Sequence, residues 1–173
     1  MQLQVSEDLN LVIKYAREEA MRTGSYSIDA DHLFLGILRH GSNRAVEVLR
    51  SLGVDTATCK SEIDSRIFHE HSIPYGSEDD IRLGREGSNT VSLAIAEAIA
   101  DGAEEAGAMH ILKAVCKQEK SHSSEYLRRR GLCSGIFAKN RPARNKSEID
   151  LSHKEIGILI STMKLNPDKT IVS

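Results

Sequence analysis

Apolar residues recur at helical spacing along the first part of the chain. After Ser6, leucine, isoleucine and alanine appear every three or four positions as far as Gly24, and charged residues occupy the other face. Serine favours a helix start and glycine a helix end, so we predict a helix between them. Residues 32–38 are apolar on every side, which predicts a second helix buried all round. Gly36 inside it indicates close contact with another helix, because glycine costs a helix about 1 kcal/mol relative to alanine.

Two further helices are predicted before a polar linker. Ser42 can cap a third helix that ends at Gly53, and Asp55 opens a fourth that runs through about Phe68. Residues 69–90 contain a proline, three glycines and mixed charges, which indicates a linker.

The pattern of the first half returns more weakly after this linker. We expect a helix from Ser88 or Asn89 to Gly102, a buried helix over 108–116, and a third helix from Ser121 or His122 to Gly131. A short apolar piece, 135–138, stands where the first half has its fourth helix.

The two halves are copies of one unit. Shifted by 78 positions, residues 12–54 align with residues 90–132 without a gap, and ten of the 43 pairs are identical. The identical pairs are Ala16/Ala94, Glu19/Glu97, Ala20/Ala98, Gly24/Gly102, Ala30/Ala108, His32/His110, Glu47/Glu125, Leu49/Leu127, Arg50/Arg128 and Gly53/Gly131. Matched glycines and small residues fall where helices end or touch, so the copies share a backbone shape.

These observations predict an all-α fold built from two pseudo-symmetric repeats of about four helices each. We place one domain over 1–140, with the first repeat at about 5–68 and the second at about 84–138. Residues 141–173 are expected to form a basic linker and a C-terminal helix. The core is expected to include Leu33, Leu38, Leu49, Ile111 and Leu127.

Composition and charge narrow the classes of function. The net charge is −2, so nothing global points to nucleic acid or a membrane. Lysines and arginines without an acidic residue do gather over 128–146, but Phe137 is the one aromatic residue among them. A solvated face or a contact with an acidic partner is favoured there over nucleic-acid binding. The three cysteines form no CxxC motif, and no signal peptide or spanning run is present, so we expect a cytoplasmic protein with reduced thiols.

The repeated pattern resembles the N-terminal repeat domain of Clp ATPases of the ClpA/ClpC type. The residues that carry the resemblance in the first copy are Ala16, Glu19, Ala20, Gly24, Ile28, Asp31, His32, Leu33, Phe34, Leu35, Gly36, Leu38, Ala45, Leu49, Gly53 and Val54. The resemblance implies an all-α, pseudo-twofold domain that docks substrates and adaptor proteins onto a hexameric AAA+ unfoldase feeding a protease. The chain has no G-x-x-x-x-G-K-[ST] loop, so these residues are expected to be either the N-terminal domain of a longer unfoldase or a free-standing relative.

The resemblance also implies a binding site. Asp31 stands where several relatives have an acidic residue, and Ser6 where they have a threonine, in a pocket for phosphorylated arginine. The alternative is that Ser6 caps a helix and Asp31 favours a helix N-terminus electrostatically. The second copy places Gly84 and Met109 at these positions, so we expect at most one such site per chain, near Asp31.

The remaining candidates favour structural roles. His32 and His110 are expected to be hydrogen-bonded residues at helix starts, because no nucleophile or acid repeats with them. His69 and His71 could ligate a metal, but a flexible pair without a further ligand is weak support, so no metal or cofactor is expected.

Three functions are therefore considered. The first is a non-catalytic module that binds protein substrates or adaptors in the Clp system. The second is a free-standing accessory subunit that stabilises a Clp assembly, and the third, more distant, is a nucleic-acid binder acting through 128–146. An enzyme is not expected, since no nucleophile–base set, metal cluster or cofactor loop stands out.

Overall fold

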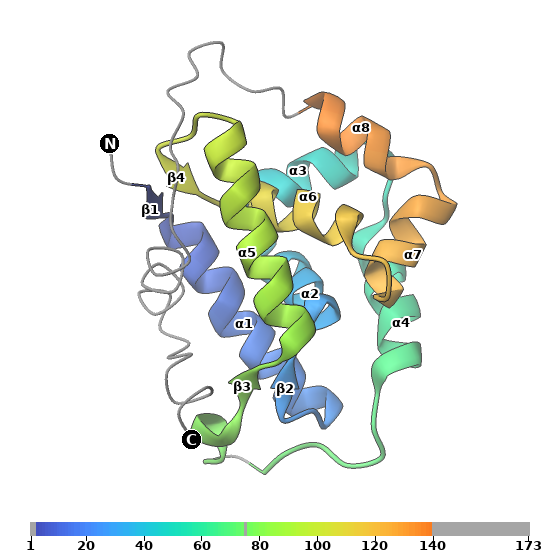
Figure 1. Cartoon of the computed structure of the whole chain (residues 1–173). Helices are drawn as coiled ribbons and strands as arrows, with labels where there is room; N and C mark the ends of the chain where they lie inside the picture. The colour runs from blue at the N-terminus through green and yellow to red at the C-terminus, as the bar shows by residue number, and fades with distance from the viewer. Residues whose placement is uncertain (1–2, 75, 140–173) are drawn as a thin grey trace.

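The structure is a computed structural model that describes residues 3–74 and 76–139. Eight α-helices account for most of this part of the chain (Figure 1). The helices are α1 (Glu7–Thr23), α2 (Ala30–His40), α3 (Arg44–Ser51), α4 (Thr56–Ile67), α5 (Arg85–Ala100), α6 (Ala108–Lys117), α7 (His122–Arg129) and α8 (Leu132–Lys139). The expected all-α, two-repeat fold is confirmed. The basic linker and C-terminal helix predicted for 141–173 lie outside the described residues, so the division at 140 stays a prediction.

The 78-residue offset holds for the helix starts. Helices α5, α6 and α7 begin 78 positions after α1, α2 and α3, while α8 begins 76 positions after α4. The expectation of a mere apolar piece in place of a fourth helix was wrong. The reason is tertiary packing, because Ile136 is fully buried and Gly135 leaves room for Leu52, whose Cδ2 would lie 2.9 Å from an added Cβ.

The core lies between the α1–α2 pair and the α5–α6 pair. Gly36 of α2 packs on the backbone of α1, where a Cβ would collide with the Val12 carbonyl oxygen and lie 2.9 Å from the Ala16 nitrogen. This is the close helix approach expected of a glycine inside an apolar run. Of the five predicted core leucines and isoleucines, four are fully buried, and Leu38 at the end of α2 is half-buried.

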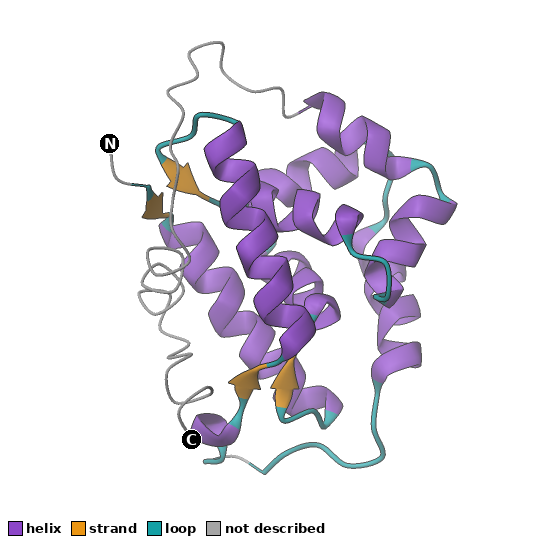
Figure 2. Cartoon of the chain, in the orientation of Figure 1, coloured by secondary structure: helices purple, strands orange, loops and turns teal. Residues whose placement is uncertain are grey.

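Two short strand pairs, which the sequence did not indicate, join the repeats. Strand β1 (Gln4–Val5) pairs in parallel with β4 (Glu105–Ala106), and β2 (Ser27–Ile28) pairs in parallel with β3 (Arg82–Leu83). Figure 2 shows the two pairs at opposite ends of α1 and α5. By the 78-residue offset, β3 is the counterpart of β1 and β4 is the counterpart of β2. The two pairings are therefore equivalent, and each joins a strand of one repeat to a strand of the other.

The helix caps agree with the sequence at some positions and correct it at others. Ser6 and Ser121 cap α1 and α7 as expected, each accepting a backbone N–H at 3.0 Å. The cap of α3 is Asn43 rather than Ser42. Helix α5 begins at Arg85, earlier than a start at Ser88 or Asn89, and its N-cap is Gly84. Glycines in the left-handed region follow helices at equivalent places in the two repeats, namely Gly24, Gly53, Gly102 and Gly131.

The start of α5 is fixed by the strand pair beside it. The Gly84 N–H donates to the Ile28 carbonyl oxygen at 2.9 Å, which completes the β2–β3 ladder immediately before the helix. The connection before it contains a short 3₁₀ turn, Glu78–Asp80. In the described residues no helix is long and apolar enough to span a bilayer.

Candidate functional site

Ser6 acts as a helix cap at the junction of the two repeats. Its Oγ accepts the Leu9 N–H at 3.0 Å, and its own N–H donates to the Ala106 carbonyl oxygen at 3.0 Å. The Oγ lies beside the start of α6, 3.5 Å from where a Cβ on Gly107 would stand. Its hydroxyl oxygen is therefore already engaged in holding the first turn of α1.

Asp31 ties the first repeat to the second. Its Oδ1 accepts the backbone N–H and the hydroxyl of Ser123, both at 2.7 Å, and its Oδ2 accepts the His122 N–H at 3.3 Å. The side chain is buried. A carboxylate at the N-terminus of α7 also complements the helix dipole. Both oxygens thus accept hydrogen bonds from the start of α7.

The structure does not bring Ser6 and Asp31 together. Ser6 starts α1, whereas Asp31 lies beside the opposite end of α1, where the Thr23 hydroxyl is 3.3 Å from His32 Nε2. The 17 residues of α1 separate these ends by about 25 Å. The structure therefore shows no single pocket that contains both residues, and binding of a substrate or adaptor at Ser6 and Asp31 stays a prediction. In the second repeat Met109 is buried, which corresponds to packing in the core.

His32 and His110 occupy equivalent positions at the starts of α2 and α6. Nδ1 of His32 accepts the Asp29 N–H at 3.0 Å, and Nδ1 of His110 accepts the Gly107 N–H at 2.9 Å. Because Nδ1 is the acceptor, the neutral ring carries its proton on Nε2. Burial lowers the pKa of His32 to about 4, against the smaller opposing effect of Asp31. These are structural residues that cap their helices from the third position.

The partners of the two histidine Nε2 atoms differ between repeats. Thr23 faces His32, and the equivalent Asp101 lies 3.1 Å from His110 Nε2. Lys113 donates to the same carboxylate at 2.9 Å and pairs with Glu97 at 3.1 Å. Burial lowers the pKa of His110 as well, although Asp101 acts in the opposite direction. Within 3–74 and 76–139, no group of three potential ligands could hold a metal ion, and His69 and His71 are exposed.

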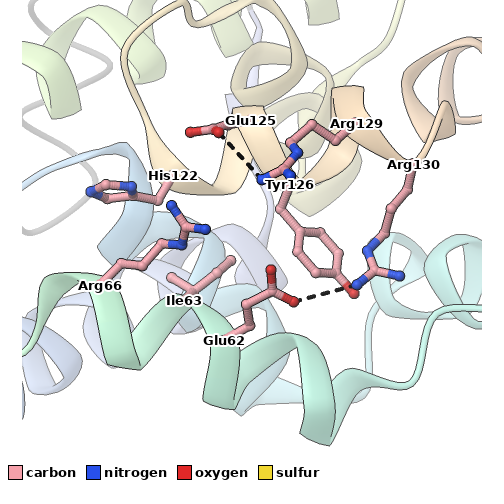
Figure 3. A pocket seen from close by; sticks show the side chains of 8 residues that line it. All are labelled: Glu62, Ile63, Arg66, His122, Glu125, Tyr126, Arg129 and Arg130. Atoms are coloured by element: carbon pink, nitrogen blue, oxygen red, sulfur yellow. Dashed lines mark hydrogen bonds and ion pairs between the residues drawn. The ribbon is translucent and has the colours of Figure 1, made fainter.

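Two surface hollows lie where helices of the two repeats meet. One hollow of about 250 Å³ separates α4 from α7 (Figure 3). It is lined by Glu62, Ile63, Arg66, His122, Glu125, Tyr126, Arg129 and Arg130. A second hollow, of about 450 Å³, lies by the start of α2, the segment after α4 and the α6–α7 loop. Arg66 and His122 line both hollows, so we describe them together as the α4–α7 groove.

The floor of the groove is apolar and chemically inert. Ile63 and Tyr126 are buried there. Burial and, to a smaller extent, the neighbouring Cys59 thiol raise the pKa of Tyr126 to about 12. Burial also raises the pKa of Cys59 to about 11. Both groups are neutral near pH 7, so this floor suits binding and not nucleophilic chemistry.

The rim of the groove carries charges of both signs, with three arginines and two glutamates around the first hollow. Arg130 pairs with Glu62 at 3.3 Å across the gap and stacks over Tyr126 at 4.3 Å. Arg129 pairs with Glu125 at 3.6 Å. One sign of this asymmetry was overlooked in the sequence, where the offset places Arg129 and Arg130 at the positions of Ser51 and Leu52 in the first repeat.

Comparison with known proteins identifies the repeat. A family model described as the Clp repeat (R) N-terminal domain matches residues 4–130. A probable ATP-dependent Clp protease ATP-binding subunit of Chlamydia pneumoniae is 40% identical over 67 residues, which are 39% of this chain and 7% of that protein. The negative regulator of genetic competence ClpC/MecB of Bacillus subtilis is 25% identical over 127 residues, which are 73% of this chain and 15% of that protein. The chain thus spans less than a sixth of the length of these relatives.

A solved structure has the same fold. The N-terminal domain of the caseinolytic protease associated chaperone ClpD from Arabidopsis thaliana superposes with a TM-score of 0.62 and 15% identity. The match covers 79% of this chain and 94% of that domain.

Proposed function

The chain belongs to the Clp N-terminal repeat family, and on this premise we propose that it is a non-catalytic protein-binding module that docks substrates or adaptor proteins in a Clp system. The match over residues 4–130, which covers the first repeat and the second as far as α7, carries this proposal. The resemblance to ClpA/ClpC-type domains implies that the module docks its partners by surface contact. The energy for unfolding them would come from an ATPase module elsewhere. The inert floor of the α4–α7 groove supports binding over catalysis.

The second candidate is an accessory subunit that stabilises a Clp assembly. The same family membership supports it, since the chain would then contact the unfoldase itself.

The nucleic-acid alternative has less support. Arg128 donates to the Glu119 carbonyl oxygen at 3.2 Å, and Arg129 and Arg130 are in ion pairs. Residues 140–146 of the basic stretch lie outside the described part of the chain.

Binding experiments with the purified chain separate the two Clp functions. A permanently unfolded model protein and a purified ClpC-type hexamer are offered separately, and sedimentation velocity reports complex formation. A docking module binds the unfolded protein, or an adaptor, without nucleotide and without hydrolysing ATP. An accessory subunit binds the hexamer instead and shifts its assembly to lower protein concentration. Binding to neither species contradicts both functions.

A further inference from the structure

We propose that the α4–α7 groove binds an acidic segment of a partner protein, with a guest carboxylate between Arg66 and His122 and an apolar guest side chain against Phe68. This inference rests on the proposed function as a protein-binding module and names the chemistry of the partner. The site lies apart from Ser6. Asp31 lines the second hollow, but its carboxylate accepts hydrogen bonds from α7 and is not one of the proposed contacts.

The charges of the groove leave a cationic centre open. Glu62 and Glu125 each pair with an arginine, Arg130 and Arg129 respectively. The side chains of Arg66 and His122 form no hydrogen bond or ion pair with any other residue in the described ranges. Figure 3 shows both extending into the gap between α4 and α7. A guanidinium with free donors accepts a carboxylate through charge-assisted, often bidentate, hydrogen bonds.

An apolar contact lies next to this centre. Phe68 follows α4 directly, is 55% exposed, and lines the second hollow together with Arg66 and His122. A large exposed aromatic side chain beside a concave surface is typical of a protein contact. Asp29 and Glu86 line the same hollow, so the guest carboxylate is placed at the junction of the hollows and its apolar neighbour at Phe68.

The dimensions and charges favour a polypeptide over nucleic acid. A hollow of about 250 Å³ accommodates one or two side chains. Asp29 and Glu86 in the second hollow would repel successive phosphates of a strand, whereas a single carboxylate at the junction of the hollows can be placed away from them. The partner is therefore a protein segment with isolated acidic residues.

The groove occurs once in the pseudo-twofold arrangement. The equivalent gap between α3 and α8 is filled, because Leu52 packs onto Gly135. In the α4–α7 groove the counterpart of Leu52 is Arg130, which stacks on Tyr126 and leaves the hollow open. We expect one such site per chain.

The test uses the full chain and a short fluorescent peptide in which a single glutamate precedes a leucine. Fluorescence anisotropy at low salt should show saturable one-to-one binding. Arg66→Gln should weaken it about tenfold, the loss expected when one charge-assisted hydrogen bond is removed. Phe68→Ser should weaken it about fivefold through lost apolar contact. Circular dichroism and urea unfolding check that both exposed substitutions leave the fold intact.

Matched controls exist for both substitutions. Arg44 is the residue that the offset aligns with His122, and it lies on α3 outside the groove, so Arg44→Gln should leave the affinity unchanged. Tyr26 is exposed like Phe68 but lines neither hollow, so Tyr26→Ser should also have no effect.

Three results would overturn the inference. They are an unchanged affinity in Arg66→Gln, equal binding of a peptide with glutamine in place of glutamate, and displacement of the peptide by a single-stranded oligonucleotide at equal concentration. Failure of the acidic peptide while an unfolded protein or an adaptor still binds removes this inference and leaves the proposed function standing. Failure of every protein ligand removes both.

Discussion

Asp31 of the first repeat accepts two hydrogen bonds of 2.7 Å from Ser123 of the second, one from its backbone N–H and one from its hydroxyl. Both residues are buried, so this contact between α2 and α7 is shielded from solvent. A carboxylate that caps a helix in the other repeat couples the two halves as well as completing the helix.

Asp31→Ala should therefore destabilise the protein. The substitution leaves the N–H groups of His122 and Ser123 without their acceptor, and we expect a loss of about 2–4 kcal/mol in the free energy of unfolding. Ser123→Ala removes only the hydroxyl bond and should cost about 1 kcal/mol. Urea unfolding measures both. A loss below about 0.5 kcal/mol for Asp31→Ala would show that α7 does not depend on this carboxylate.

Gly36→Ala should also be destabilising, by about 1–3 kcal/mol, because even one methyl group meets the backbone of α1. Gly36→Leu should cost more for the same reason. Thermal unfolding followed by circular dichroism gives the change in melting midpoint. A midpoint equal to that of the natural chain would mean that α1 and α2 can separate without cost.

The stability should fall as the solution is acidified, through His32. Burial holds its pKa at about 4 in the folded chain, below the value of about 6.5 for an exposed histidine. The folded state thus favours the neutral ring, and this contribution is complete above pH 6.5 and is lost as the pH falls towards 4. Its full size is on the order of 3 kcal/mol.

Two measurements check this pH dependence. Urea unfolding at pH 7 and pH 4.5 should show a smaller difference in His32→Gln than in the natural chain, and His110 keeps some dependence in the same direction. Ring-proton NMR follows His32 itself. A His32 titration centred near pH 6.5 would contradict the effect of burial.

The three thiols should react in a set order. Cys59 and Cys116 are buried, and burial raises the pKa of both thiols, whereas Cys133 is half-buried. Because the thiolate is the reactive form, iodoacetamide at pH 8 should modify Cys133 first and the other two on unfolding. Peptide mass spectrometry resolves the order, and early modification of Cys59 would indicate opening between α4 and α7.

The helices and the repeat could be predicted from the sequence because both are recorded in local patterns. Apolar spacing located α1 and α2, and the ungapped offset required equivalent helix starts in the second repeat. Gly36 could be assigned to a helix contact because a glycine in an apolar helix needs a packing reason.

Features that depend on the other repeat could not be predicted. Helix α5 starts directly after Gly84 because the strand pairing with Ile28 ends there, although Ser88 and Asn89 are better caps in isolation. For Asp31 the sequence left a ligand site and a helix N-terminus open, and it does not show that the start of α7 lies against this residue. The α4–α7 groove was missed for the same reason, since it exists only where helices of different repeats meet.

The strand pairs imply that each repeat supplies the strand with which a strand of the other repeat pairs. Strand β1 pairs with β4, which is the counterpart of β2, yet β1 and β2 lie at opposite ends of α1 and cannot meet within one repeat. In an isolated first repeat, β1 and β2 would both lack a strand to pair with. Two identical copies could satisfy each other, so the present chain has the architecture of a dimer whose subunits have become covalently joined.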